Sequence, residues 1–355
     1  EFIRTEEGVT VMDILISEFS GEVSLMPDTY WLQHGGIDVR AFIEKYKERI
    51  SILHLKDMAV GKDGPHITTV GNGNINFKGA IESAHRVNTV SPSYAQEILD
   101  PWFSHHMDSI LKARQWKLSG ILNGIDQVYY NPAADSEIPF EFTPEDTTGK
   151  TKCKLAFQKE YGLPEDADAP MMAVISRLAS HKGVDIIAGM LRHVLETHPK
   201  AQFVVLGTGE GQYESYFRQL EQDFPERVRA FITYNRALSK KIYAAADIFL
   251  MPSKSEPCGL SQMIACRYGT VPVVRETGGL YDSIKPYFED CNGPHGNGFT
   301  FANYEASELE ERTCAALELY EREPEKFAAL RYRALTSDFS WDASAEKYME
   351  MYQNM

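Results

Sequence analysis

The sequence has few cysteines, and none of them lie close together. Five are scattered over 355 residues without a CxxC pair. An odd, dispersed set provides no disulfide framework, so we expect a reducing compartment, the cytoplasm. No apolar run reaches the roughly eighteen residues of a membrane span, and the first ten residues lack the basic and apolar regions of a signal peptide. These absences argue against a membrane protein and against an exported one.

Positive charge is also scarce. There are 36 Lys and Arg against 51 Asp and Glu, a net charge of −15. Such a chain repels phosphate backbones and anionic lipid, so we expect neither a nucleic-acid partner nor a membrane partner. Hydrophobic residues make up 43% of the chain, which suffices for real cores, and the length suggests about two domains.

From about Met171 onward, short β-rich runs alternate with amphipathic stretches, beginning with MMAVISRL and VDIIAGMLRHVLETHP. This alternation predicts an α/β fold with a parallel sheet covered by helices on both faces. Ligands of such sheets bind at the carboxyl ends of the strands. The loops SRLASHKG, GTGEG and PSKSEPCG are expected at those ends.

The loop SRLASHKG carries two cations, Arg177 and Lys182, between a strand and a helix. An arginine fork and a compact lysine charge near a helix N-terminus suit a pyrophosphate. The alternative is that both are solvated surface cations. GTGEG lacks the full GxGxxG spacing, so it is only weakly indicative of a dinucleotide site, and its glycines can instead serve a tight turn.

The segment PSKSEPCGLSQ places an acid, Glu256, before a Pro-Cys-Gly turn that starts a helix. Backbone N–H groups of Gly259, Leu260 and Ser261 can hold phosphate oxygens, and Glu256 can accept hydrogen bonds from sugar hydroxyls. Two plainer interpretations remain open. Cys258 is equally well a small buried hydrophobe, and Glu256 an ordinary acid at a helix N-terminus.

Several ordered motifs together resemble the bacterial glycogen synthase family, from about residue 86 to residue 355. They are RVNTVSPSYAQEI, LSGILNGID, YNPAAD, SRLASHKG, VVLGTGEGQYE, ADIFLMPSKSEPCGLSQMIACRYGTVPVVRETGGL, GNGFTF and DFSW. The resemblance implies a GT-B glycosyltransferase, of which this part would be the C-terminal Rossmann-like domain. It also implies retaining transfer of glucose from ADP-glucose to the non-reducing end of an α-1,4-glucan such as glycogen. The family uses no metal or other cofactor, since ADP-glucose is a substrate.

The resemblance assigns roles to individual residues. Arg177 and Lys182 match the pair that neutralises the ADP leaving group, and Glu256 matches the acid that contacts the donor glucose. The implied substrate-binding residues are Tyr234, which would stack on adenine, Cys258, Gly259, Leu260 and Ser261 of the phosphate turn, and Gly278 and Gly279 near the donor sugar.

The sequence also departs from the family pattern. Ile264 occupies the position where related glycosyltransferases have a second glutamate, and His181 stands where the family usually has glutamine. The family's KTGGL loop and its acceptor-side residues have no counterpart upstream of Arg86. We therefore expect impaired transfer, because catalysis needs both walls of a closing cleft.

Upstream, GEVSLMPDTYW and RISILHLKDMAV predict strands around a helical IDVRAFIEKYKER, and the segment VGNGNINFKGAIESA follows. With these segments, residues 1–84 resemble a fragment of a sugar phosphate isomerase/epimerase, a TIM barrel. Asp28 and His54 match possible metal ligands, but two ligands of about four make a poor site, so no metal is predicted. A partial barrel leaves sheet edges unpaired, and we expect this segment to pack poorly.

The expected division is thus 1–84 barrel fragment, 85–135 end of the GT-B N-domain and linker, and 136–355 nucleotide-sugar-binding domain. Besides a glycogen synthase, two alternatives stay open: a metal-dependent isomerase/epimerase remnant and a non-catalytic ADP-binding fragment.

Overall fold

The computed structural model describes residues 10–291 and 293–354. The chain forms two compact units. The smaller unit comprises residues 1–88 and 95–119, and the sheet unit comprises 89–94 and 120–355. Three elements lie where the chain passes between the units, namely β3 (Val87–Thr89), α5 (Pro92–Glu97) and β4 (Leu118–Gly120).

The smaller unit is mostly helical. Its elements are α1 (Val11–Glu18), α2 (Thr29–His34), α3 (Val39–Tyr46), the 3₁₀ turn η1 (Lys47–Arg49), β1 (Asp57–Gly61), β2 (Gly64–Thr68), α4 (Phe77–Ser83), α6 (Asp108–Ala113) and η2 (Gln115–Lys117). Buried side chains such as Ile16, Phe42, Phe77 and Leu111 form its own apolar core. Large apolar side chains such as Met26, Trp31 and Val60 are nevertheless exposed, so the expectation of poor packing stays a prediction.

The TIM-barrel-like architecture expected for residues 1–84 is not confirmed. Residues 1–9 lie outside the described part; in the remainder, β1 and β2 form an antiparallel hairpin, and parallel pairing is limited to isolated bridges such as Asp28 with His54. The segment DTYW, read as a strand, is instead the start of α2. The Asp28 carboxylate accepts the N–H groups of Tyr30 and Trp31, and this N-cap favours a helix.

A six-stranded, fully parallel sheet organises the sheet unit, in the order β12-β9-β8-β5-β6-β7. The strands are β5 (Met171–Ile175), β6 (Gln202–Leu206), β7 (Val228–Phe231), β8 (Ile248–Met251), β9 (Val271–Arg275) and β12 (Phe299–Phe301). Alternate side chains of β5 enter two different cores, Met171 and Ala173 on one face and Met172 and Val174 on the other. Burial on both faces explains why these strands are continuous apolar runs.

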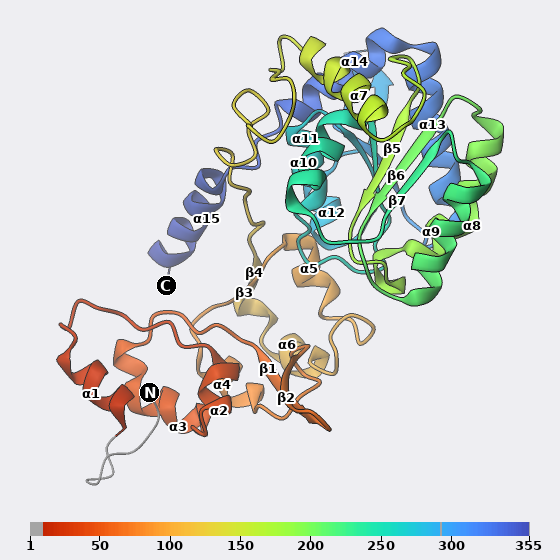
Figure 1. The fold of residues 1–355 in the computed structure, drawn as a ribbon. Helices are drawn as coiled ribbons and strands as arrows, with labels where there is room; N and C mark the ends of the chain where they lie inside the picture. The colour runs from red at the N-terminus through yellow and green to blue at the C-terminus, as the bar shows by residue number, and fades with distance from the viewer. Residues whose placement is uncertain (1–9, 292, 355) are drawn as a thin grey trace. The chain divides into compact units, whose positions relative to one another are not determined.

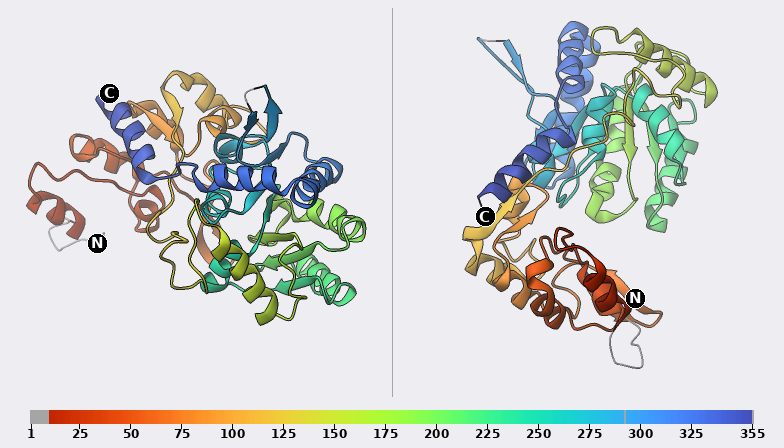
Figure 2. Two further views of the ribbon diagram at one scale, coloured as in Figure 1. Left: turned by 90° about the horizontal axis from the view of Figure 1, so that it is seen from above. Right: turned by 90° about the vertical axis from the view of Figure 1, so that its left-hand side faces the viewer.

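Helices cover both faces of this sheet (Figure 1). The elements between and after the strands are α7 (Thr148–Glu160), η3 (Ser180–Lys182), α8 (Val184–Thr197), α9 (Gly211–Asp223), α10 (Arg236–Ala245), α11 (Ser261–Arg267), α12 (Gly278–Ser283), α13 (Ala306–Arg322), α14 (Pro324–Leu335) and α15 (Trp341–Gln353). A hairpin of β10 (Phe288–Asp290) and β11 (Gly293–His295) projects from the layers (Figure 2). The predicted α/β architecture is confirmed.

A buried ionic cluster lies at the amino ends of the two central strands. Asp247, directly before β8, accepts hydrogen bonds from Lys154 Nζ at 2.6 Å, from Arg331 Nη2 at 2.7 Å and from the Met171 N–H at 2.9 Å. The Asp247 and Lys154 side chains are only 2% and 4% exposed. The cluster joins α7, α14, β5 and β8 at the amino ends of the strands, opposite the carboxyl ends where a ligand site is expected.

The chain reverses its direction of travel across the sheet between β5 and β8. From β5 it proceeds outward to β6 and β7, and then returns to β8 and proceeds the other way to β9 and β12. The crossover helices diverge at such a switch point and leave a crevice at the carboxyl ends of the two strands. The topology therefore predicts a ligand site after Ile175 and Met251.

Candidate donor-substrate site

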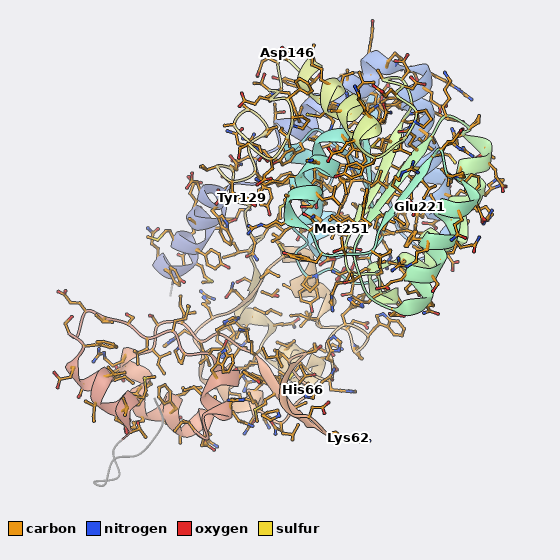
Figure 3. All side chains as sticks on the ribbon, viewed as in Figure 1. Lys62, His66, Tyr129, Asp146, Glu221 and Met251 are labelled. Atoms are coloured by element: carbon orange, nitrogen blue, oxygen red, sulfur yellow. The ribbon has the colours of Figure 1, made fainter. Side chains whose placement is uncertain are left out.

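A cavity of about 200 Å³ lies at this switch point. It is lined by Ile175, Ser176, Arg177, Lys182, Leu250, Met251, Ser253 and Ser261. Met251, at the end of β8, is labelled in Figure 3. Arg177, Lys182 and Ser261, three of the residues predicted from the sequence, thus meet at one place.

Lys182 and Glu256 form an ion pair beside the cavity. Lys182 Nζ donates to Glu256 Oε2 at 2.7 Å, and Ser253 Oγ donates to the same oxygen at 3.0 Å. The lysine side chain is 20% exposed and the glutamate side chain 9%. Two donors therefore hold the Glu256 carboxylate. One of them, the Lys182 ammonium, is still accessible to solvent and to a ligand.

Arg177 is exposed and contacts His181, whose Nε2 lies 3.1 Å from the guanidinium Nη2. Burial lowers the pKa of His181 below its ordinary value, and the neighbouring Lys182 and Arg177 cations lower it further. The lowered pKa favours the neutral imidazole, whose Nε2 can accept a hydrogen bond from the guanidinium. His181 thus serves as a support for Arg177.

Local backbone geometry holds the two cations at the strand end. The loop enters α8 through Gly183, whose φ of +79° suits glycine, and any Cβ there would collide with the Pro252 carbonyl. The Lys254 N–H donates to the His181 carbonyl at 3.0 Å. These contacts join the loop after β5 to the loop after β8.

The GTGEG loop braces the SRLASHKG loop. The Leu178 N–H donates to the Thr208 carbonyl at 2.9 Å, and the Glu210 N–H donates back to the Leu178 carbonyl at 2.7 Å. A Cβ at Gly207 would overlap the Ser176 carbonyl. The glycines therefore permit close approach of the two loops, a role that neither interpretation of the motif from the sequence had given them.

The Pro-Cys-Gly turn and the later Thr-Gly-Gly turn pack against each other. The Gly279 N–H donates to the Glu256 carbonyl at 3.0 Å, and a Cβ at Gly279 would overlap the Cys258 carbonyl. Gly259 and Gly278 have positive φ, at +70° and +44°. The structure therefore brings the two predicted glycine turns together around the backbone of Glu256.

The remaining predicted residues differ in position. Cys258 is buried, and burial raises the pKa of its thiol, which makes it a small apolar side chain rather than a nucleophile. Leu260 is 47% exposed and Ser261 begins α11. Tyr234 follows β7, is 88% exposed and does not line the cavity. Its stacking role stays a prediction.

Sequence reasoning missed several participants. Ser176 and Ser253 line the cavity, and Gln262 is fully buried behind the Pro-Cys-Gly turn. Ser176 directly follows β5 and Ser253 lies two residues after the end of β8, so the strand-end rule itself could have found them. Nothing in the sequence singles out Gln262.

The smaller unit brings Asp28 and His54 together, as the isomerase resemblance required. His54 Nδ1 lies 3.3 Å from Asp28 Oδ2, but Lys56 Nζ lies 3.0 Å from the same oxygen, and the carboxylate also caps α2. A cation and two backbone donors already satisfy this acid. In residues 10–291 and 293–354 no three His, Cys, Asp or Glu side chains gather as a metal site.

The described part of the chain also contains no helix both long and apolar enough to cross a membrane.

Two family models match the chain. Residues 158–334 match the glycosyl transferases group 1 model, and residues 44–113 match the starch synthase catalytic domain model. The second match includes residues 44–84, which the sequence had assigned to an isomerase-like fragment. The resemblance to the synthase family therefore begins well before residue 86.

Curated relatives agree with both matches. Glycogen synthases of Bacillus licheniformis and Clostridium perfringens are 45% and 44% identical over 297 and 293 residues, which is 82% and 81% of this chain. Each match covers 60% of the relative, so the chain spans about 60% of the length of these proteins.

Solved structures show the same fold. The catalytic domain of starch synthase IV from Arabidopsis thaliana, bound to ADP and acarbose, has a TM-score of 0.72 and 39% identity over 78% of this chain and 57% of that one. The fold alone is shared with Anabaena Alr3699/HepE in complex with UDP, which has a TM-score of 0.58 and 17% identity over 89% of this chain and 75% of that one. The cavity, its two cations and these matches agree: residues 158–334 match the glycosyl transferases group 1 family, and the chain is a homologue of the glycogen synthases.

Proposed function

We propose that this chain belongs to a hexosyltransferase that moves glucose from ADP-glucose to the non-reducing end of an α-1,4-glucan, with retention. The observation that carries the proposal is the switch-point cavity with Arg177 and Lys182 at its wall and Glu256 beside Lys182. The ADP and acarbose bound to the starch synthase homologue support a nucleotide-sugar donor and a glucan acceptor. ADP-glucose and glycogen are thus the proposed partners, with no nucleic acid and no cofactor.

The two cations suit the departing diphosphate. Charge accumulates on the ADP oxygens as the glycosidic bond to glucose breaks, and preorganised cations stabilise that charge. Arg177 can grip two oxygens with its planar fork while Lys182 supplies a point charge. Arg177 and Lys182 carry two positive charges and Glu256 one negative charge, so these three side chains together have a net charge of +1. The neutral form of His181, which its lowered pKa favours, adds no further charge.

The Lys182–Glu256 pair also links donor binding to the sugar contact. When Lys182 turns to a diphosphate oxygen, Glu256 Oε2 loses one of its two donors and can accept a hydrogen bond from a sugar hydroxyl instead. In this proposal Cys258, Gly259, Leu260 and Ser261 form the phosphate turn, and Gly278 and Gly279 lie near the glucose.

We further propose the domain roles that the resemblance implies. Residues 136–355 would form the nucleotide-sugar-binding domain, and 85–135 the end of the other GT-B domain and the linker. The cytoplasmic location expected from the cysteines stays a prediction. The comparisons supply no support for an isomerase or epimerase activity.

Calorimetric titration with ADP tests the donor site directly. Lys182→Gln and Arg177→Gln should each weaken ADP binding by about 1.5–3 kcal/mol, the usual contribution of a charged hydrogen bond. Lys200→Gln is the matched control, because it removes an exposed lysine that precedes β6, at the amino ends of the strands.

Two results would overturn the proposal. One is the absence of both binding heat and thermal shift at millimolar ADP. The other is equal weakening by the control and the site variants. UDP titrated in parallel shows whether the site prefers adenine.

A further inference from the structure

Gln262 lies fully buried on α11, and the two N–H groups of its amide serve three acceptors, so that two acceptors share one N–H. Its Nε2 lies 3.2 Å from the Cys258 carbonyl, 3.0 Å from the Gly259 carbonyl and 3.0 Å from Ser283 Oγ. Its Oε1 has no hydrogen-bond partner among the described residues. A buried carbonyl without a partner costs free energy, so what this side chain contributes is its donor group.

Ser283, the last residue of α12, connects Gln262 to Gly279 through its hydroxyl. Its hydroxyl accepts from Gln262 Nε2 and donates to the Gly279 carbonyl at 2.6 Å. The Gly279 N–H in turn donates to the Glu256 carbonyl at 3.0 Å. Since Glu256 and Cys258 are two residues apart in the chain, the bonds close a ring through Gln262, Ser283, Gly279, Glu256 and Cys258.

This ring ends at the acid of the donor site. The Glu256 backbone is held from one side by Gly279, and the turn that follows it is held by Gln262, while its carboxylate meets Lys182 and Ser253. A shift of the turn would therefore carry the Glu256 carboxylate with it. The Cys258 side chain packs in the apolar core, and the bonds from Gln262 additionally fix the Cys258 and Gly259 carbonyls.

We propose that Gln262 is a positioning residue that orients Glu256 toward the donor sugar through this ring. The inference rests on the proposed function, since it assigns the sugar contact to Glu256. Arg177 and Lys182 lie outside the ring, whereas the Cys258 and Gly259 carbonyls of the proposed phosphate turn belong to it. Loss of the Gln262 donor should therefore weaken the sugar contact of Glu256 more than the diphosphate contact.

The test measures dissociation constants of ADP and ADP-glucose for the full chain by calorimetry. Gln262→Met keeps the length of the side chain and removes its donor. We expect the ratio of the ADP-glucose dissociation constant to the ADP dissociation constant to rise at least tenfold, while the ADP constant itself rises by a smaller factor. Ser283→Ala removes the acceptor of Gln262 and the donor to Gly279 but leaves the bonds from Gln262 to the Cys258 and Gly259 carbonyls, so it should raise the ratio by a smaller factor. Gln219→Met, an exposed glutamine on α9, should leave both constants unchanged.

A double-variant cycle shows whether Glu256 is the route. In a Glu256→Gln background, Gln262→Met should no longer change the ratio, because its effect acts through that carboxylate. An unchanged ratio in the single variant, or a parallel loss of both affinities, would overturn the inference. If the unsubstituted chain does not bind ADP at all, the proposed function itself fails. That outcome differs from an unchanged ratio and from a parallel loss of both affinities, which count against the inference alone.

Discussion

The Lys154–Asp247–Arg331 cluster should contribute strongly to the stability of the sheet unit, and Asp247→Asn tests this. An asparagine can still accept one hydrogen bond at its Oδ1, but its NH₂ group faces a cation that also donates, and two buried cations lose their counter-charge. Removing one partner of a buried ion pair typically costs about 3–5 kcal/mol. This corresponds to roughly two to three and a half orders of magnitude in the opening equilibrium.

Burial already lowers the pKa of Lys154, and Asp247 counteracts that effect. In Asp247→Asn the pKa of Lys154 should therefore fall further. The folded variant then binds fewer protons than the unfolded chain, so its stability rises with pH. The destabilisation should accordingly be larger at pH 7 than at pH 9.

Hydrogen exchange in β5 and β8, followed by mass spectrometry and corrected for intrinsic exchange rates, measures the opening of this unit separately from the other. Asp223→Asn is the control, since Asp223 pairs with Arg192 on the surface, where such a pair contributes about 0–1 kcal/mol. If the two substitutions reduced protection equally, the reasoning from burial would be wrong.

Three further predictions concern the donor site. The His181 titration midpoint, followed by ¹³C NMR, should lie below its ordinary value of about 6.5 and rise in Lys182→Gln, because the Lys182 cation helps to lower this pKa; a midpoint above 6.5 would contradict the neutral support for Arg177. Tyr234→Ala should weaken ADP binding by about 1–3 kcal/mol, the range for base–aromatic stacking, while Tyr234→Phe and the affinity for pyrophosphate stay unchanged; equal losses for ADP and pyrophosphate would exclude stacking. A polypeptide of these 355 residues should transfer glucose to glycogen more slowly than a full-length relative, measured with labelled ADP-glucose, and an equal rate would show that the expected impairment is wrong.

The smaller unit shows where sequence reasoning failed. DTYW has the composition of a strand, yet one carboxylate, that of Asp28, caps the following N–H groups and starts a helix. The likeness to an isomerase depended on reading that segment as a barrel strand. A local side-chain to backbone bond outweighed β-propensity, which is a weak and context-dependent preference.

The sheet unit shows the opposite. Its alternation of apolar runs and amphipathic stretches determined a parallel, doubly covered sheet, because strands buried on both faces cannot tolerate polar residues. The proximity of Arg177, Lys182 and Glu256 could also be predicted from residue type and position, because the loops at the carboxyl ends of parallel strands lie along one edge of the sheet.

By itself, then, the sequence determined the fold class, the ends of the strands at which the cavity lies and the two cations that line it. Only the tertiary structure decided which groups touch: the Lys182–Glu256 pair, the His181 support, and the ring from Gln262 to Glu256. Periodicity and spacing report which face or edge a residue occupies. Lys182 and Glu256, by contrast, are 74 positions apart in the chain. Contacts between loops that follow different strands depend on how the strands and helices pack, and no local pattern encodes them.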